Sequence, residues 1–216
     1  NYHTDEFKIV PILLIRPWED KVFFVQEIEK HQVEYFTIPV AIKSREKGRD
    51  FFRVVRCYRK LMSILRDNDF DIIHTHGYFA DILGVLAAKV IRLPHISTCH
   101  GFIQSDKKIR FYNYLCCYCL RFSDKIVAVS NTIREYLIER NVDQSRIVVI
   151  ENAVEIGNTN SSMPDSDHFR INLGLATNIF TIGFIGCLSK AKGIDFLCNA
   201  VAERMQLSIP MQLIII

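Results

Sequence analysis

Short apolar runs alternate with longer amphipathic stretches along most of the chain. The clearest case lies near the middle, where the apolar run 71–73 precedes a segment of helix-forming residues over 80–91 and a second apolar run over 95–99. Pro94 separates the last two segments, because proline cannot continue a helix. The pattern predicts strand, helix and strand, which is the β-α-β unit of a parallel sheet.

The same alternation continues on both sides of this unit. We expect helices over 20–31, 44–66, 107–122, 131–140 and 194–205. We expect further strands over 7–15, 34–40, 125–129, 147–150, 180–185 and 211–216. Strands that alternate with helices indicate the α/β class, and we predict two Rossmann-like domains whose parallel sheets face a cleft.

A polar segment separates the two predicted domains. Residues 155–166 are rich in asparagine and serine and contain glycine and proline, which is typical of linkers. We therefore expect an N-terminal domain over 1–155, a linker or hinge over 156–176 and the first β-α-β unit of a C-terminal domain over 177–216. Because about forty residues cannot bury a core of their own, we expect the sequence to be a fragment of a longer protein.

Composition narrows the class of protein. Apolar residues make up 49% of the chain and charged residues 24%, as in soluble globular proteins. The net charge of +3 gives no indication of nucleic-acid binding. No apolar run approaches the roughly 20 residues that a membrane span needs. The seven cysteines show no regular framework, which indicates reduced thiols in a cytoplasmic protein.

The predicted helix over 44–66 carries an apolar and a basic stripe. The apolar stripe consists of Phe51, Val55, Tyr58, Met62 and Leu65. The basic stripe consists of Arg49, Arg53, Arg56 and Lys60. A solvated outer face explains the basic stripe. Attraction to an anionic membrane surface, at about 1 kcal/mol per basic residue, also explains it and would place the protein peripherally on the inner face of a membrane.

Polar residues and glycines follow the predicted strands of the first domain. They are His74, His76, Gly77, His100, Ser130 and Asn152. The carboxyl ends of parallel strands meet at one edge of a sheet, where open α/β proteins bind ligands. Several polar strand ends at one edge favour a binding site over simple capping of the strands.

The loop over 186–193 has the features of an anion site. It contains Gly186, Ser189, Lys190 and Lys192, and it opens a predicted helix. Backbone N–H groups and the helix dipole favour an anion there, so a phosphate group of a ligand fits. An ordinary loop with solvated lysines explains the spacing equally well. The sequence contains neither a P-loop nor a dinucleotide-binding glycine motif.

Four segments, in this order, resemble the retaining glycosyltransferase family four, whose members have the two-domain GT-B fold. They are DIIHTHGYFADILGVLAA, PHISTCHGF, SDKIVAVSNTIREYLIER through RIVVIENAVE, and IGFIGCLSKAKGIDFLCNA. The resemblance covers residues 71–200. It implies transfer of a sugar, with retention, from a nucleotide-sugar donor to a glycan or lipid-linked acceptor. It implies neither a metal nor another cofactor.

The resemblance also implies roles for single residues. His100 matches the histidine beside the transferred sugar and is the candidate catalytic residue, and His76 matches a cleft position on the acceptor side. Asn152 matches the polar residue in the segment that leads to the hinge. Lys192 matches the lysine that holds the donor diphosphate. Catalysis then consists mainly of neutralising the charge that develops on the leaving diphosphate.

The sequence departs from the family in the anion-binding loop. Cys187 follows the loop glycine, where the family usually has arginine, and a thiol cannot replace a fixed cation. The family's glycine-rich N-terminal loop and its C-domain pair of glutamates separated by seven residues are expected beyond the ends of this sequence. We therefore expect the 216-residue polypeptide alone not to transfer sugar.

Two other functions fit parts of the pattern. A metal-dependent hydrolase would use His74, His76 and His100 as ligands, although such a site also needs a carboxylate at a neighbouring strand end. A non-catalytic nucleotide-binding or scaffolding relative would explain Cys187 as a sign of lost chemistry.

Overall fold

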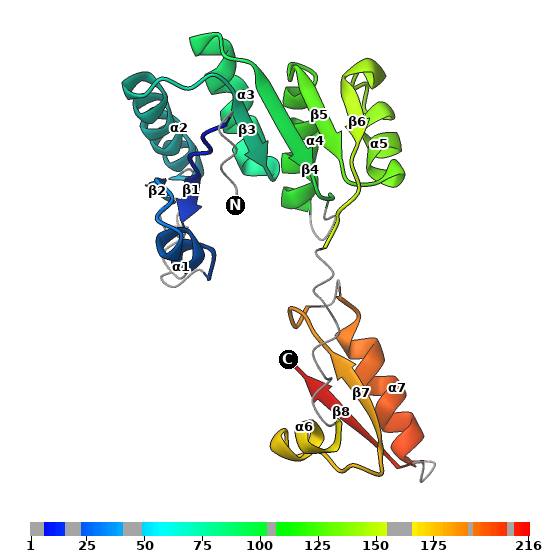
Figure 1. Ribbon diagram of the computed structural model, residues 1–216. Helices are drawn as coiled ribbons and strands as arrows, with labels where there is room; N and C mark the ends of the chain where they lie inside the picture. Colours follow the sequence, from blue (N-terminus) through cyan, green and yellow to red (C-terminus); the bar gives the residue numbers. More distant parts are fainter. Residues whose placement is uncertain are drawn as a thin grey trace. The chain divides into compact units, whose positions relative to one another are not determined.

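The computed structural model describes residues 7–15, 23–40, 49–102, 107–154, 166–189, 192–206 and 210–216 (Figure 1). The chain divides into two compact units, 1–152 and 153–216. All strand pairs among the described residues are parallel. The prediction of a Rossmann-like α/β fold with parallel sheets is therefore confirmed.

A four-stranded parallel sheet forms the centre of the first unit. Its strands are β3 (Ile73–His76), β4 (His95–Cys99), β5 (Lys125–Ala128) and β6 (Ile147–Val149), in that spatial order. The connecting helices are α3 (Tyr78–Ile91), α4 (Lys107–Leu120) and α5 (Asn131–Ile138). Right-handed crossovers between neighbouring strands place all three helices on one face of the sheet, as Figure 1 shows.

The remaining elements of the first unit precede this sheet. They are β1 (Ile12–Ile15), α1 (Phe23–Lys30), β2 (Phe36–Pro39) and α2 (Arg49–Asp67). Strands β1 and β2 pair with each other as a separate two-stranded sheet. A short 3-10 helix, Gln144–Arg146, precedes β6. The second unit contains α6 (Ser166–Asn172), β7 (Phe180–Phe184), α7 (Ile194–Gln206) and β8 (Met211–Ile215).

Several elements differ in extent from the sequence predictions. The first strand begins at Ile12 rather than at residue 7, and Phe7 and Ile9 are exposed without a strand partner in the described part of the chain. Helix α5 ends at Ile138, two residues early, because the chain turns there and Asn141 adopts a left-handed conformation. Residues 166–172 of the expected linker form helix α6. Residues 20–22 and 44–48, predicted as helix starts, lie outside the described residues.

Helix α2 buries most of the described part of the predicted apolar stripe, since Met62 and Leu65 are buried and Tyr58 packs against the core. Its buried side chains are Cys57, Leu61, Met62, Ile64 and Leu65. Val55, which we expected in the core, is 36% exposed, whereas its neighbour Val54 packs against the core. Two adjacent valines left the apolar pattern ambiguous at this turn, and the packing of α2 on β2 and α3 places Val54 rather than Val55 against the core.

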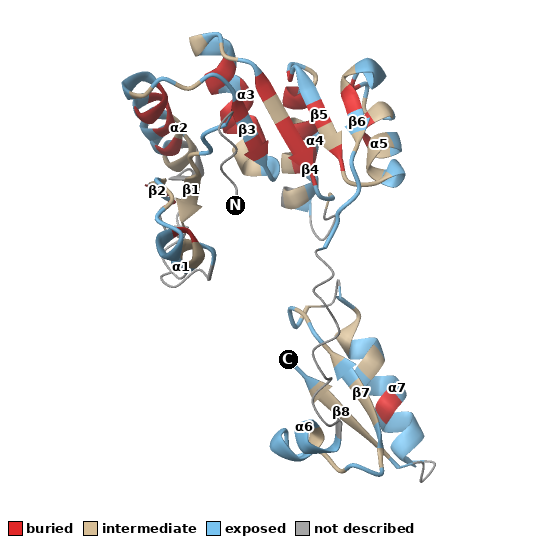
Figure 2. Cartoon of the chain, in the orientation of Figure 1, coloured by how far each residue is buried: buried red, intermediate tan, exposed pale blue. Residues whose placement is uncertain are grey.

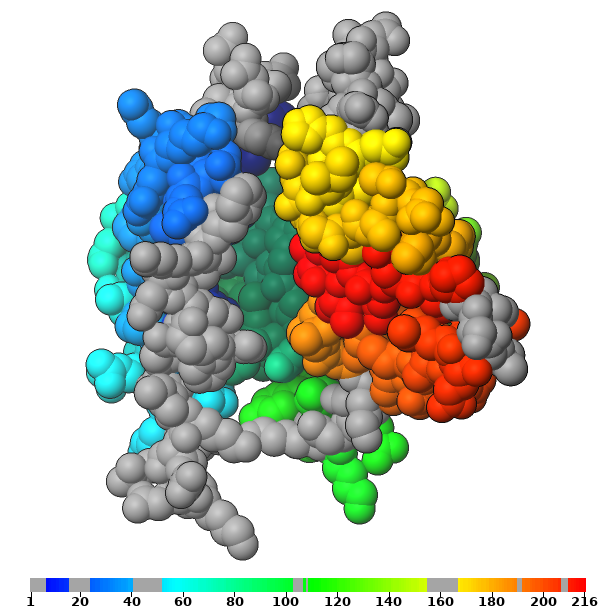
Figure 3. Space-filling view, turned by 90° about the horizontal axis from the view of Figure 1, so that it is seen from below, coloured from blue at the N-terminus to red at the C-terminus, as the bar shows by residue number. Residues whose placement is uncertain are grey.

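The second unit has little buried surface among its described residues. Val201 on α7 is its one buried residue there, as Figure 2 shows in red. The side chain of Gln212 on β8 accepts from the backbone N–H of Ala176 at 3.1 Å and donates to its carbonyl at 2.8 Å. In the space-filling view of Figure 3 this unit presents α6 in yellow, β8 in red and α7 in orange to red.

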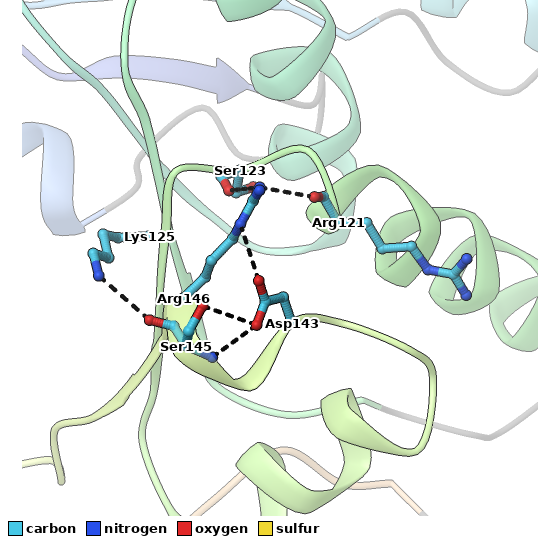
Figure 4. Close-up of polar contacts among 6 residues, drawn as sticks. All are labelled: Arg121, Ser123, Lys125, Asp143, Ser145 and Arg146. Atoms are coloured by element: carbon cyan, nitrogen blue, oxygen red, sulfur yellow. Dashed lines mark hydrogen bonds and ion pairs between the residues drawn. The ribbon is translucent and has the colours of Figure 1, made fainter.

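A polar cluster fixes the amino-terminal edge of the four-stranded sheet. Figure 4 shows its members, Arg121, Ser123, Lys125, Asp143, Ser145 and Arg146. Arg146 donates to the backbone carbonyls of Arg121 and Ser123 at 3.0 and 2.9 Å. Asp143 accepts from the N–H and the hydroxyl of Ser145 at 2.9 and 2.8 Å. These hydrogen bonds hold the loops that lead into β5 and β6. None of these residues lies at the carboxyl edge of the sheet.

A buried carboxylate joins the centre of the sheet to α3. Asp81 is 2% exposed, and its Oδ1 accepts from Thr75 on β3 at 2.6 Å and from Ser97 on β4 at 2.7 Å. Cys116 on α4 donates to the other carboxylate oxygen at 3.6 Å. Burial raises the pKa of Asp81, and the three donors counteract this rise by stabilising the charged form. The carboxylate thus links two strands and two helices.

This network fixes the tautomer of His95, a fully buried residue of β4. The hydroxyl of Thr75 donates its hydrogen to Asp81. The Thr75 oxygen therefore accepts from His95 Nε2–H at 3.1 Å. His95 Nδ1 then lacks a proton and accepts from the hydroxyl of Ser123 at 3.0 Å. Burial lowers the pKa of His95 to about 4, which keeps the imidazole neutral.

Replacing Gly84 by alanine is expected to disrupt this network. Gly84 lies on α3, and a Cβ atom there would collide with the Thr75 methyl group and lie 3.1 Å from His95 Nε2. We expect Gly84→Ala to destabilise the protein by about 1–3 kcal/mol in urea unfolding, although alanine is the better helix former. Leu86→Ala on the same helix, at a position 49% exposed, is the control and should change stability by less than about 0.5 kcal/mol. Equal or higher stability of Gly84→Ala would contradict the packing described here.

Stability should fall as the pH decreases from 6.5 towards 4. The folded-state pKa of His95, about 4, lies below the ordinary value of 6.5, so the unfolded state binds more protons in this window. The contribution of His95 is complete above pH 6.5 and amounts to about 3 kcal/mol over the full window. His95→Gln keeps one donor and one acceptor but does not titrate, so its urea-unfolding free energy should vary less with pH. A parallel pH dependence in parent and variant would refute this role.

Candidate functional site

Two histidines meet at the carboxyl edge of the four-stranded sheet. His76 is the last residue of β3 and pairs in register with Thr98 of β4, and His100 follows the end of β4. His76 Nδ1 and His100 Nε2 lie 3.1 Å apart, and the two rings stack with centroids separated by 5.4 Å. This contact joins two of the residues that the sequence singled out.

A third histidine supports the pair from within β3. The rings of His74 and His76 lie 4.6 Å apart, and His74 Nε2 is 2.8 Å from the hydroxyl of Thr98. Side chains alternate along a strand, and Thr75 points to α3. His74 and His76 therefore lie on the face of the sheet opposite to α3. Thr98 was not predicted, since a strand threonine carries no distinctive signal in the sequence.

The surroundings of His74 and His76 disfavour the protonated form of both rings. Burial lowers the pKa of His74. Burial also lowers the pKa of His76, and the neighbouring His74 and His100 lower it further. A hydrogen bond between two imidazole rings uses one nitrogen of each ring. Each ring then keeps its other nitrogen for a hydroxyl or carbonyl group of a ligand.

The cluster does not have the arrangement of a metal site. Within the part of the chain that the structure describes, no group of three or more His, Cys, Asp or Glu side chains is placed to hold a metal ion. Each of these three histidines has one ring nitrogen in hydrogen-bonding contact, with Thr98 or with a neighbouring histidine. The geometry therefore does not support the hydrolase alternative.

The other predicted edge residues have varied surroundings. Gly77 adopts φ +91° at the start of α3, and nothing lies within 4 Å of the position of a Cβ atom there. Ser130 is the N-cap of α5, and its hydroxyl accepts from the N–H of Ile133 at 3.3 Å. Asn152 is exposed at the end of the first unit. The space beside Gly77 at the end of β3 is therefore unoccupied, whereas the side chain of Ser130 caps helix α5.

The predicted anion loop of the second unit is partly closed on itself. Gly186 has φ +153°, and its N–H donates to the carbonyl of Ile216 at 3.1 Å. The N–H of Ser189 donates to Cys187 at 2.8 Å, and that of Lys192 donates to Ser189 at 3.0 Å. Those N–H groups serve the loop, so the exposed side chain of Lys192 is the part that can reach an anion. Lys190 lies outside the described residues.

The cysteines form no disulfide bonds. All seven cysteines are free thiols, of which Cys187 and Cys198 are exposed. No helix among the described residues is both long enough and apolar enough to cross a membrane.

Comparison with known proteins identifies relatives that act on sugars. The chain is 26% identical over 174 residues to the UDP-Gal:alpha-D-GlcNAc-diphosphoundecaprenol alpha-1,3-galactosyltransferase of Escherichia coli, covering 78% of this chain and 44% of that protein. It is 26% identical over 159 residues to an uncharacterized glycosyltransferase of Methanocaldococcus jannaschii, covering 68% of this chain and 40% of that protein. The chain thus spans less than half the length of these curated relatives.

Solved structures share the fold at low sequence identity. The Anabaena protein Alr3699/HepE in complex with UDP-glucose aligns with a TM-score of 0.68 and 15% identity, over 95% of this chain and 68% of that one. The UDP-GlcNAc 2-epimerase of Neisseria meningitidis aligns with a TM-score of 0.59 and 15% identity, over 97% of this chain and 65% of that one. At such identities the likeness shows the fold alone.

The family assignment rests on a sequence match. The family model described as Glycosyltransferase Family 4 matches residues 16–157, which is more than half of the chain. The matched segment contains the four-stranded sheet and the histidine cluster at its edge. This chain belongs to Glycosyltransferase Family 4.

Proposed function

We propose that this protein transfers a sugar, with retention, from a nucleotide-sugar donor to a glycan or lipid-linked acceptor. The observation that carries the proposal is the His76–His100 contact at the sheet edge, inside the segment that matches the family. The Escherichia coli relative is named for a UDP-sugar donor and a diphosphoundecaprenol-linked acceptor, which supports both substrate classes.

His100 serves as the residue beside the transferred sugar in this proposal. Its contact with His76 limits the rotation of the ring, so one nitrogen is presented to the ligand in a fixed direction. His76, Gly77, Ser130 and Asn152 then provide the acceptor side. A preorganised hydrogen bond at the reacting sugar costs little reorganisation during the reaction, which is how such a group lowers the barrier.

Lys192, assisted by Gly186, Ser189 and Lys190, serves the donor diphosphate. The leaving group gains negative charge in the transition state, and a nearby ammonium stabilises it. Cys187 adds no positive charge where the family usually has arginine. Lys192 therefore provides more of the stabilisation of the leaving diphosphate. We also propose that residues 1–216 alone do not turn over substrate, since they span less than half the length of the curated relatives.

The test is sugar transfer by the product of the complete gene, assayed with UDP-sugars and a diphosphoundecaprenol-linked acceptor. We expect His100→Ala to lower kcat by about 10²–10³-fold, the size seen when one transition-state hydrogen bond is removed. His168→Ala on α6 removes an exposed histidine outside the site and should retain full activity. Parental kcat in His100→Ala, or activity of the 216-residue chain alone, would refute the corresponding claim.

We propose further that α2 contacts an anionic membrane surface. Arg56 and Lys60 are exposed on this helix, whereas Arg53 is half-buried, and Arg49 begins the helix. Each basic residue near such a surface contributes about 1 kcal/mol.

Reversing two of these charges tests the contact. Arg56→Glu/Lys60→Glu should weaken binding to phosphatidylglycerol-containing vesicles by more than about tenfold, measured by co-sedimentation. Lys125→Glu/Arg204→Glu, which reverses as many charges elsewhere, is the control. Equal binding by both double variants would refute a specific role of α2, and no binding by the parent would remove the proposal.

A further inference from the structure

A cationic and aromatic pocket lies between α4 and α5 of the first unit. The cavity has a volume of about 160 Å³ and is lined by Arg110, Asn113, Tyr114, Tyr136 and Arg140. None of these residues belongs to the histidine cluster or to the loop over 186–193. The first unit therefore has a second place where a polar ligand fits.

Arg140 is held in place at one wall of this pocket. Its guanidinium lies 3.4 Å from the centre of the Tyr136 ring, and its Nη1 donates to the Tyr136 carbonyl at 2.9 Å. The backbone carbonyl of Arg140 in turn accepts from Arg121 Nε and Nη2 at 3.2 and 2.7 Å. The Tyr136 ring and carbonyl hold the guanidinium, and Arg121 holds the backbone of the same residue, so the side chain loses little entropy when it binds an anion.

The charges around the pocket favour an anion. Helix α4 carries Lys107 and Arg110 in its first turn and contains no acidic residue. One carboxylate lies near the opposite wall, since Glu139 Oε2 is 3.6 Å from Arg140 Nη1, but its side chain is 73% exposed and screened by solvent. Two guanidinium groups beside tyrosine and asparagine side chains are typical partners of a phosphate group.

An exposed aromatic stripe on α4 borders the pocket. Phe111, Tyr114, Tyr118 and Phe122 are between 46% and 63% exposed. Their spacing of three, four and four residues places them on one side of the helix and its C-terminal end, and Tyr114 belongs to both the stripe and the pocket. Arg121 lies 5.4 Å from the centre of the Tyr118 ring. Aromatic rings with flanking cations are characteristic of protein surfaces that settle at a membrane interface.

We propose that the α4–α5 pocket binds the phosphate group of an anionic phospholipid while the aromatic stripe enters the headgroup layer. The phosphate matches the two arginines, and the apolar part of the lipid matches the stripe. This proposal is independent of sugar transfer, because it uses no residue of the histidine cluster or the diphosphate loop.

Vesicle binding by the parent and two single variants tests the proposal. Arg110→Gln removes an exposed arginine of the pocket, and Arg204→Gln on α7 removes the same charge far along the sequence from it. Vesicles of phosphatidylcholine with and without phosphatidylglycerol are compared by co-sedimentation. We expect Arg110→Gln to weaken binding to the anionic vesicles about tenfold, because it removes a charge-assisted hydrogen bond to the phosphate. We expect Arg204→Gln to change binding less than twofold, because it removes only diffuse electrostatic attraction.

Inorganic phosphate distinguishes a lipid ligand from a soluble one. Shifts of the Arg110, Asn113 and Tyr136 amide signals in NMR spectra, saturating with phosphate and absent in Arg110→Gln, would support a phosphate site. If these shifts occur but vesicle binding does not depend on Arg110, the ligand is a soluble phosphate compound and the lipid assignment fails. If Arg110→Gln and Arg204→Gln bind vesicles equally and phosphate causes no such shifts, the pocket is not a phosphate site.

Discussion

The buried carboxylate of Asp81 is the constraint on which the first unit depends. A carboxyl group with 2% exposure is costly to bury unless donors surround it, and here hydroxyls from β3 and β4 and a thiol from α4 supply them. Two of these donors, Thr75 and Ser97, are sequence neighbours of His74, His76 and Thr98. Holding Thr75 and Ser97 on one face of the sheet therefore fixes the position of the histidines on the other.

The pattern of apolar runs was enough to predict the parallel sheet and its helices. It also predicted which strand ends meet, because topology alone brings His76 and His100 to one edge. It did not predict that their rings touch, nor that Asp81, Thr75 and His95 form a buried chain of hydrogen bonds. Those features depend on side-chain directions and on the close approach that Gly84 permits, which periodicity does not encode.

The fold alone does not decide between functions. A protein solved with UDP-glucose and a UDP-GlcNAc 2-epimerase both superpose on this chain at 15% identity. What separates such proteins is the chemistry placed at the strand ends. In this chain the end of β3 and the residue after β4 carry a hydrogen-bonded histidine pair.

The first unit offers its two faces to different partners under these proposals. Helices α3, α4 and α5 cover one face of the four-stranded sheet, whereas His74 and His76 lie on the other. A phospholipid bound between α4 and α5 would therefore not compete with a sugar near His100. Because the helices pack directly on the strands that carry the histidines, a membrane contact at α4 would also restrict the orientation in which the sheet edge meets a lipid-linked acceptor. Under these two proposals, an acceptor presented by the same membrane would meet the sheet edge in a fixed orientation, whereas one that diffuses freely would not.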